Sequence, residues 1–223
     1  MNAGLILAGG TAERLKGYDK PKQFIEVGGK LLISYCLEVF KNSPDIDLIC
    51  VVVADEWRVI LGDYIYAKPG KSRQHSIYSG LIELEQHKPD KVVIHDAARP
   101  RVTEGDIKGV IEASIGHDGA TPVLPVSDTM YDSIDGRTIS RTLDREGIFA
   151  GQTPECYDFL KYLEIHKNTS DDGLSKVKGS SEIAVSNNLK IAICKGSPEN
   201  LKVTTKTDLE FFVAHIENSG EEI

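Results

Sequence analysis

The sequence lacks the features of secreted proteins, of membrane proteins and of proteins that a structural zinc site stabilises. Its four cysteines, Cys36, Cys50, Cys156 and Cys194, include no two at metal-ligand spacing, so neither a zinc site nor a disulfide framework is expected. No apolar run approaches the roughly 18 residues of a membrane-spanning helix. No basic segment precedes the apolar run near Met1, as it would in a signal peptide. These absences predict a cytoplasmic protein with reduced thiols and no membrane segment.

The sequence also lacks an excess of positive charge. It carries 26 basic and 34 acidic side chains, and its formal net charge is -8. An acidic chain is not expected to bind nucleic acid or an anionic membrane through bulk charge. An anionic small molecule remains possible wherever lysines and arginines cluster locally. The 223 residues contain no repeat or low-complexity tract and are 40% hydrophobic, which predicts a single domain over residues 1–223.

Apolar runs that resemble buried strands alternate with segments of helical spacing. The runs are continuous rather than alternating, which is typical of strands covered on both faces. The sequence therefore predicts a doubly wound α/β fold, with a mostly parallel sheet and helices on both faces. The expected strands are 4–7, 48–54, 91–95 and 120–126, and the expected helices are 31–40, 76–84 and 106–114.

One polar segment interrupts this alternation. Residues 127–142 carry an Asp135-Gly136 pair between two short β-like runs, which is a strong hairpin signal. We expect a β-arm over about 127–146 that projects from the main sheet. Because a two-stranded arm is marginally stable alone, a second subunit is expected to support it, as a homodimer.

A glycine turn follows the first expected strand. Gly9 and Gly10 come two residues after Leu7, and Arg14 and Lys22 follow in the same loop. Backbone N–H groups of such a turn can bind phosphate oxygens, which the two basic side chains would neutralise. The segment lacks the G-K-[ST] of a P-loop and the glycines of a dinucleotide fingerprint. The alternative is an ordinary strand-to-helix turn with solvated basic residues.

A carboxylate follows the expected strand 91–95. His95 and Asp96 stand at its carboxyl end, where open α/β sheets bind ligands. Asp96 suits Mg²⁺, which prefers oxygen ligands, and Arg99 can reach phosphate with two N–H groups. The alternative is that Asp96 caps a turn or helix. His95 is expected to orient the loop, because no second potential ligand of that type lies nearby.

Six motifs in a fixed order give the sequence its resemblance to a known family. It resembles the 2-C-methyl-D-erythritol 4-phosphate cytidylyltransferases and the related ribitol-5-phosphate cytidylyltransferases, from Leu5 to about Ile216. The resemblance implies a nucleotide-diphospho-sugar transferase-like fold and an arm that reaches the partner subunit's site. The motifs are L-A-G-G…P-K-Q-F (7–10, 21–24), H-D-A-A-R-P (95–100), S-D-T (127–129), D-R-E-G (144–147), G-Q-T-P (151–154) and N-L-K-V-T-T (200–205).

The resemblance also implies roles for individual residues. Three basic residues would act on the triphosphate, namely Arg14, Lys22 and Lys202. The CTP-binding residues would be Ala8, Gly9, Gly10, Thr11, Ser76, Gly80, Asp96, Ala97 and Arg99. The incoming polyol phosphate would contact Thr129, Arg145 and Thr153. Asp96 would hold Mg²⁺.

The implied reaction converts CTP and 2-C-methyl-D-erythritol 4-phosphate to 4-diphosphocytidyl-2-C-methyl-D-erythritol and pyrophosphate, in isoprenoid precursor synthesis. The H-D-A-A-R-P and D-R-E-G motifs favour this substrate, whereas the length of loop 16–20 is closer to the ribitol enzymes. D-ribitol 5-phosphate, converted to CDP-ribitol for envelope polymers, is therefore the alternative substrate. A non-catalytic nucleotide-binding relative is a remote alternative, because it would be expected to have lost the charged site residues.

Overall fold

The structure is a computed structural model that describes residues 1–10 and 19–219. The predicted residues Thr11 and Arg14 lie outside the described part. No helix within the described part combines the length and the apolar character that a membrane crossing requires.

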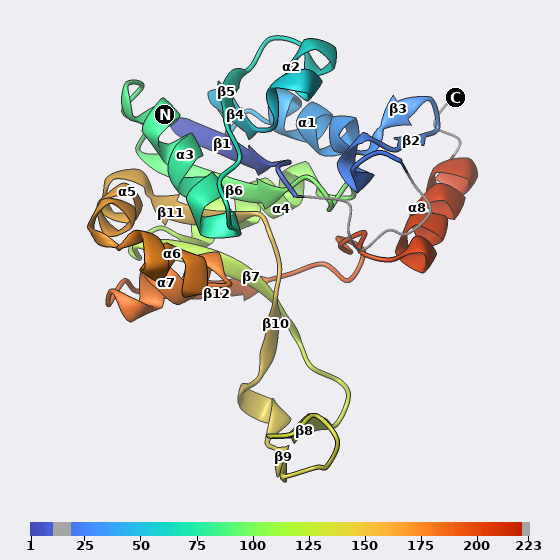
Figure 1. The fold of residues 1–223 in the computed structure, drawn as a ribbon, viewed down its shortest axis with the longest axis vertical. Helices are drawn as coiled ribbons and strands as arrows, with labels where there is room; N and C mark the ends of the chain where they lie inside the picture. Colours follow the sequence, from blue (N-terminus) through green and yellow to red (C-terminus); the bar gives the residue numbers. More distant parts are fainter. Residues whose placement is uncertain (11–18, 220–223) are drawn as a thin grey trace.

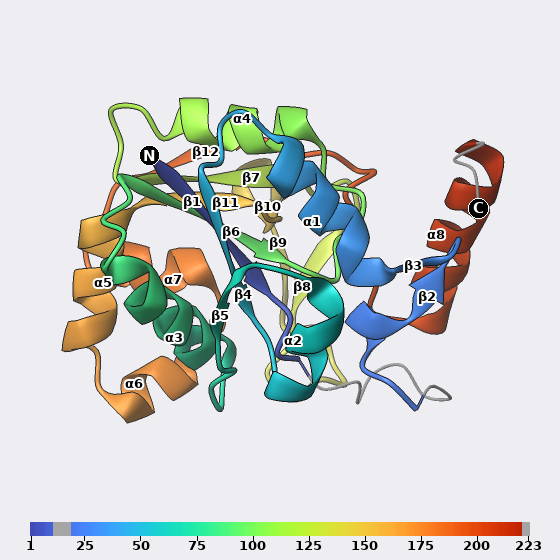
Figure 2. The same ribbon diagram turned by 90° about the horizontal axis from the view of Figure 1, so that it is seen from above.

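A mixed, mostly parallel sheet forms the centre of the molecule (Figures 1 and 2). In the described chain its strand order is β10-β7-β11-β6-β1-β4-β5, and β12 also pairs with β7. Strands β6, β1, β4 and β5 run parallel, while β11 inserts antiparallel between β6 and β7. The strands are β1 Asn2–Leu7, β4 Leu48–Val52, β5 Ile65–Ala67, β6 Lys91–Asp96, β7 Gly119–Pro125, β10 Phe149–Gly151, β11 Glu155–Asp158 and β12 Ile191–Lys195.

Helices cover both faces of this sheet, which confirms the predicted doubly wound fold (Figure 2). Alternate residues of β1 face opposite cores, since Leu5 belongs to the core that contains Ile77 and Phe159. Ile6 belongs to the core that contains Ile33 and Ile107. Burial of both faces explains why the strands appear in the sequence as continuous apolar runs. The helices are α1 Leu32–Asn42 and α4 Glu104–Ala113 on one face, and α3 Arg73–Glu85, α5 Phe159–Asn168, α6 Asp171–Lys176 and α7 Ser180–Ser186 on the other.

Two helices begin earlier than the apolar spacing predicts, because polar residues cap them. Ser72 accepts a hydrogen bond from the His75 N–H, so α3 begins at Arg73 rather than at residue 76. Thr103 and Asp106 form a capping box, so α4 begins at Glu104. The earlier start of α3 places Arg73 at the edge of the sheet.

A third, smaller core joins the segment 25–35 to the segment 201–216. Helix α8 (Lys206–Ser219) packs Phe212 and Ile216 against the short hairpin of β2 (Glu26–Val27) and β3 (Lys30–Leu31). The turn η1 (Lys22–Phe24) precedes that hairpin, and Phe24 stacks on Trp57 of α2 (Asp55–Leu61) with ring centroids 4.0 Å apart. This packing supports the segments 19–24 and 200–205, which both reach the carboxyl edge of the sheet.

The predicted hairpin is present as a separate two-stranded sheet. Strands β8 (Met130–Asp132) and β9 (Arg141–Leu143) pair antiparallel and extend away from the body of the molecule (Figure 1). The loop between them is longer than the two-residue turn that Asp-Gly often forms. Asp135 accepts two backbone N–H bonds within it, and Gly136 adopts a φ of 67°, which suits glycine. Ile134 at its tip is 94% exposed.

Candidate active site

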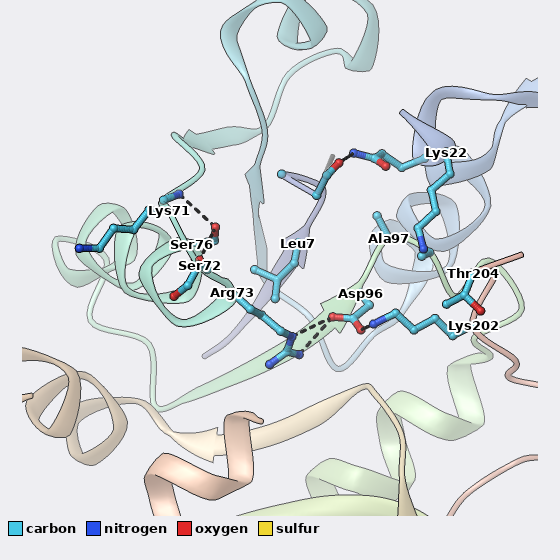
Figure 3. Close-up of a pocket in the computed structure, with 15 residues that line it drawn as sticks. Leu7, Lys22, Lys71, Ser72, Arg73, Ser76, Asp96, Ala97, Lys202 and Thr204 are labelled. Atoms are coloured by element: carbon cyan, nitrogen blue, oxygen red, sulfur yellow. Dashed lines mark hydrogen bonds and ion pairs between the residues drawn. The ribbon is translucent and has the colours of Figure 1, made fainter. Parts of the chain in front are cut away.

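A cavity of about 450 Å³ lies at the carboxyl ends of β1 and β6 (Figure 3). Four further segments complete it: the glycine turn, η1, the start of α3 and the loop after β12. This is the edge at which open α/β sheets bind ligands. The lining residues are Leu7, Gly9, Gly10, Lys22, Gln23, Gly70, Lys71, Ser72, Arg73, Ser76, Asp96, Ala97, Ala98, Lys202 and Thr204.

Asp96 lies between two cationic side chains in this cavity (Figure 3). Its Oδ1 accepts from Arg73 Nε at 3.3 Å and Nη2 at 3.1 Å, and its Oδ2 accepts from Lys202 Nζ at 2.6 Å. Burial alone would raise the pKa of Asp96, but Arg73 and Lys202 outweigh burial and hold that pKa well below its usual range. The carboxylate is therefore ionised at neutral pH and fixes two cations, one at each of its oxygens.

The glycine turn is held by the residues that follow it in the sequence. Gln23 donates from Nε2 to the carbonyl oxygens of Ala8 at 2.6 Å and Gly10 at 3.0 Å. Gly9 has no room for a side chain, because a Cβ there would lie 2.5 Å from the Cβ of Pro69. Lys22 Nζ donates to the Val203 carbonyl at 2.6 Å. These contacts hold the two segments that carry Lys22 and Lys202 next to each other.

A hydrogen-bonded pair behind the cavity positions Asp96. Thr153 Oγ1 accepts from the Asp96 N–H at 3.2 Å and lies 3.1 Å from His95 Nδ1. His95 Nε2 contacts the Arg99 carbonyl at 3.0 Å. A neutral imidazole that donates from Nε2 and accepts at Nδ1 satisfies all of these contacts. His95 therefore orients the loop, as the sequence predicted, while the buried Thr153 hydroxyl lies behind Asp96 rather than in the cavity.

Arg99 secures the loop that carries Lys202. Its Nη1 donates to the Asn200 carbonyl at 2.6 Å, and the Val203 N–H donates to the Ala98 carbonyl at 2.8 Å. Asn200 Nδ2 donates in turn to the Thr153 carbonyl at 2.8 Å. Arg99, which the resemblance placed on the nucleotide, is engaged with backbone and is not among the residues that line the cavity.

The remaining predicted nucleotide residues divide into two groups. Ser76 and Ala97 line the cavity, and Ser76 Oγ accepts from the Gly70 N–H at 3.0 Å, which shapes the opposite wall. Gly80 and Ala8 are buried and are not among the lining residues. A Cβ on Gly80 would lie 2.3 Å from Leu5 Cδ1, so this glycine allows α3 to approach β1 closely.

The two predicted substrate residues on the arm do not reach the cavity of their own chain. Thr129 is exposed, and Arg145 is exposed with its Nη1 donating to the Ser127 carbonyl. Both belong to the arm that extends away from the body, and neither lines the cavity (Figure 1).

The comparison with known proteins decides the family. The family model described as IspD, 2-C-methyl-D-erythritol 4-phosphate cytidylyltransferase, matches residues 3–217. The chain belongs to this family. Among its relatives are the bifunctional IspD/IspF enzymes of Granulibacter bethesdensis and Chelativorans sp., which are 38% and 37% identical to it. Each alignment covers 93% of this chain but only 54% and 53% of the relative, so the chain spans about half the length of these relatives.

Solved IspD structures share the fold. The cytidylyltransferase of Francisella tularensis superposes with a TM-score of 0.83 at 24% identity, covering 95% of this chain and 98% of that one. The enzyme of Thermus thermophilus gives a TM-score of 0.76 at 24% identity, with 96% and 98% covered. These similarities support the predicted nucleotidyltransferase-like architecture of this IspD family member.

Lys71 and Arg73 are charged lining residues of the cavity that were not predicted from the sequence. Both lie in the segment P-G-K-S-R-Q-H-S (69–76), of which only Ser76 was predicted to contact the nucleotide. Burial lowers the pKa of Arg73, but Asp96 and Glu155 outweigh burial and raise that pKa further above its usual range. A basic residue at the first position of a helix that follows a glycine loop was the signal available in the sequence.

The donor set of this IspD-family cavity is compatible with Mg²⁺. Asp96 is the acidic residue among the described lining residues, and no group of three or more His, Cys, Asp or Glu side chains forms a metal site in the described chain. Mg²⁺ in nucleotide sites is often held by one or two carboxylates together with phosphate oxygens and water. An ionised Asp96 fits that pattern as a single protein ligand, although Arg73 and Lys202 would have to share its oxygens.

We expect the stability of this IspD-family chain to fall as the pH drops below about 6.5, because burial lowers the pKa of His95 from 6.5 to about 4. In that window the unfolded chain binds a proton that the folded chain excludes. The loss by pH 4 is about 3 kcal/mol for this group alone. Urea unfolding at a series of pH values measures it. The His95→Gln variant should show a flatter pH dependence, whereas His117→Gln, at an exposed position, should match the wild type; equal slopes in all three would contradict the prediction.

Proposed function

We propose that this chain transfers the cytidylyl group of CTP to 2-C-methyl-D-erythritol 4-phosphate and releases pyrophosphate. The observation that carries the proposal is Asp96, which holds Arg73 and Lys202 at the carboxyl edge of the sheet in a member of the IspD family. Lys22 lines the same cavity. Two polyanionic reactants need such a cluster of cations to approach each other.

In this reaction the protein positions the reactants and stabilises charge, and it forms no covalent intermediate. The phosphate oxygen of the polyol attacks the α-phosphorus of CTP in line, and pyrophosphate leaves. That phosphate is ionised at neutral pH, so neither a protein nucleophile nor a general base is required. Lys22 and Lys202 stabilise the negative charge that develops on the α-phosphoryl oxygens. The glycine turn supplies N–H groups for the remaining phosphates.

We also propose that Asp96 is the protein ligand of Mg²⁺. When bound, the ion neutralises triphosphate oxygens and draws electron density from the phosphorus under attack. Arg73 and Lys202 hold the carboxylate of Asp96 in one orientation before the nucleotide arrives. In the described chain no other carboxylate lines the cavity.

The arm supports a further part of the proposal, a homodimer. Thr129 and Arg145 lie on an arm that does not meet its own cavity, and Ile134 and Ile139 on that arm are 94% and 64% exposed. Exposed isoleucines on a two-stranded sheet favour contact with a second copy of the chain. We propose that the arm delivers Arg145 to the polyol phosphate in the partner's cavity.

Co-expression of two defective variants tests this exchange of residues. Lys202→Ala damages the cavity and Arg145→Ala damages the arm. Mixed dimers would contain one site with an intact cavity and an intact arm, so random assembly should restore about a quarter of wild-type turnover. Each variant expressed alone provides the baseline. Turnover that stays at that baseline, in mixtures where mixed dimers are demonstrated, would show that the arm acts within its own chain.

Pyrophosphate release tests the reaction itself. CTP and Mg²⁺ are supplied with either 2-C-methyl-D-erythritol 4-phosphate or D-ribitol 5-phosphate. We expect a clear preference for the methylerythritol substrate, and loss of turnover on addition of EDTA that excess Mg²⁺ reverses. Preference for ribitol 5-phosphate would overturn the substrate assignment. Release with neither substrate would overturn the proposed activity.

A further inference from the structure

Glu155 is a buried acid that lies next to the cavity without lining it. It is the first residue of β11, which pairs antiparallel with β6, and it lies opposite Ile94, two residues before Asp96. Its side chain is only 8% exposed. Buried carboxylates are rare in proteins unless they are paired, so its contacts indicate what it does.

The two oxygens of Glu155 have different partners. Oε1 accepts from the Ser181 hydroxyl at 2.8 Å and from the Tyr157 hydroxyl at 3.0 Å. Burial and the adjacent carboxylate raise the pKa of Tyr157 well above its usual range, so this phenol keeps its proton and donates. Oε2 lies 3.6 Å from Arg73 Nη2. Two neutral donors thus fix the carboxylate, and its second oxygen faces the guanidinium.

The guanidinium of Arg73 is consequently held on three sides. Nε and Nη2 donate to Asp96, Nη1 donates to the Ser180 hydroxyl at the start of α7, and Glu155 lies beside Nη2. Arg73 lines the cavity, where an incoming triphosphate would compete for the same guanidinium. The negative charge of Glu155 attracts the guanidinium from outside the cavity, and so it opposes the movement of Arg73 from Asp96 to the triphosphate.

We infer that Glu155 is a positioning residue, which keeps Arg73 on Asp96 when the nucleotide binds and so preserves the orientation of the Asp96 carboxylate during cytidylyl transfer. The inference rests on the proposed function. It acts through Arg73, since Glu155 itself does not line the cavity. Loss of the Glu155 charge is therefore expected to raise the free energy of the transition state more than it changes the affinity for CTP.

The Glu155→Gln variant separates these effects, because it removes the charge while keeping the shape and the acceptor for Ser181 and Tyr157. We expect kcat to fall by about 10- to 100-fold, as for other changes that misplace a reacting group indirectly. The KM for CTP should stay within threefold of wild type or decrease, because the site has lost a negative charge. The matched control is Glu112→Gln, whose exposed carboxylate lies 3.9 Å from Lys108.

The outcomes distinguish positioning from general damage. A kcat within twofold of wild type, or a fall in kcat accompanied by an equal rise in KM, would overturn the inference. A wild-type enzyme that releases no pyrophosphate with any polyol phosphate would overturn the proposed function instead. In that case the thermal unfolding midpoint still tests whether Glu155 acts on Arg73.

The thermal test uses Arg73→Gln, which leaves Glu155 without its cation. Glu155→Gln should lower the unfolding midpoint in the wild-type background and raise it in the Arg73→Gln background, since a buried acid without a partner is unfavourable. This change of sign requires that Glu155 acts on Arg73. The same shift in both backgrounds would show that the two side chains are not coupled, and would overturn the inference whatever the activity of the wild type.

Discussion

Replacing Lys202 with alanine is expected to lower kcat by about 100- to 1000-fold while the chain remains folded. The ammonium group of Lys202 lines the cavity and lies 2.6 Å from Asp96 Oδ2, so its removal takes away a cation from the region where charge develops. The backbone of its loop does not depend on the side chain, because Arg99 and Asn200 hold it. Steady-state kinetics and a thermal unfolding curve measure the two expectations.

The matched control for this substitution is Lys195→Ala. Lys195 is an exposed residue at the end of β12 and does not line the cavity. It should keep wild-type turnover, which excludes a general effect of removing one positive charge from an acidic chain. A Lys202→Ala enzyme with kcat within threefold of wild type would mean that this lysine has no part in transition-state stabilisation.

Replacing Asp96 with asparagine is expected to lower kcat by at least 100-fold and to raise the Mg²⁺ concentration needed for half-maximal turnover. Asparagine keeps the shape but removes the charge that holds Arg73 and Lys202. CTP binding measured in EDTA should stay as strong or become stronger, because two cations lose their protein anion. Turnover assays over a range of Mg²⁺ concentrations and calorimetry with CTP provide the two measurements.

The same substitution has a predicted effect on stability. The folded-state pKa of Asp96 is lowered, so its charge stabilises the fold at neutral pH and that contribution is lost as the pH falls through the acidic range. Asp96→Asn should therefore unfold at a lower urea concentration at pH 7, with a smaller difference from wild type near pH 3. A variant with weaker CTP binding in EDTA and unchanged Mg²⁺ dependence would contradict the proposed role of Asp96.

The fold could be predicted because strands that are buried on both faces appear in the sequence as continuous apolar runs. The β-branched run of β4 and the K-V-V-I-H run of β6 are continuous because both faces of those strands are covered. The hairpin of β8 and β9 could be predicted from Asp135-Gly136 and its flanking segments. The predicted first residues of α3 and α4 were less accurate. These helices begin at the polar caps Ser72 and Thr103, and apolar spacing carries no information on polar caps.

The site was only partly predictable, because its contacts depend on the order of the strands. Strand β11 inserts antiparallel next to β6, which brings Thr153 and Glu155 behind Asp96. No local sequence pattern predicts that β11 is the neighbour of β6. The resemblance placed Thr153 and Arg99 on the ligands. In the structure their side chains hold the backbone around Asp96 and the loop of Lys202.

The most direct test of the central claim follows oxygen atoms through the reaction. The enzyme is given CTP, Mg²⁺ and 2-C-methyl-D-erythritol 4-phosphate whose non-bridging phosphate oxygens are ¹⁸O, and the products are analysed by mass spectrometry. Attack by the substrate phosphate on the α-phosphorus predicts a CDP-linked polyol that retains all of the label, together with unlabelled pyrophosphate. Label in the pyrophosphate, or the absence of a CDP-linked product, would contradict the account.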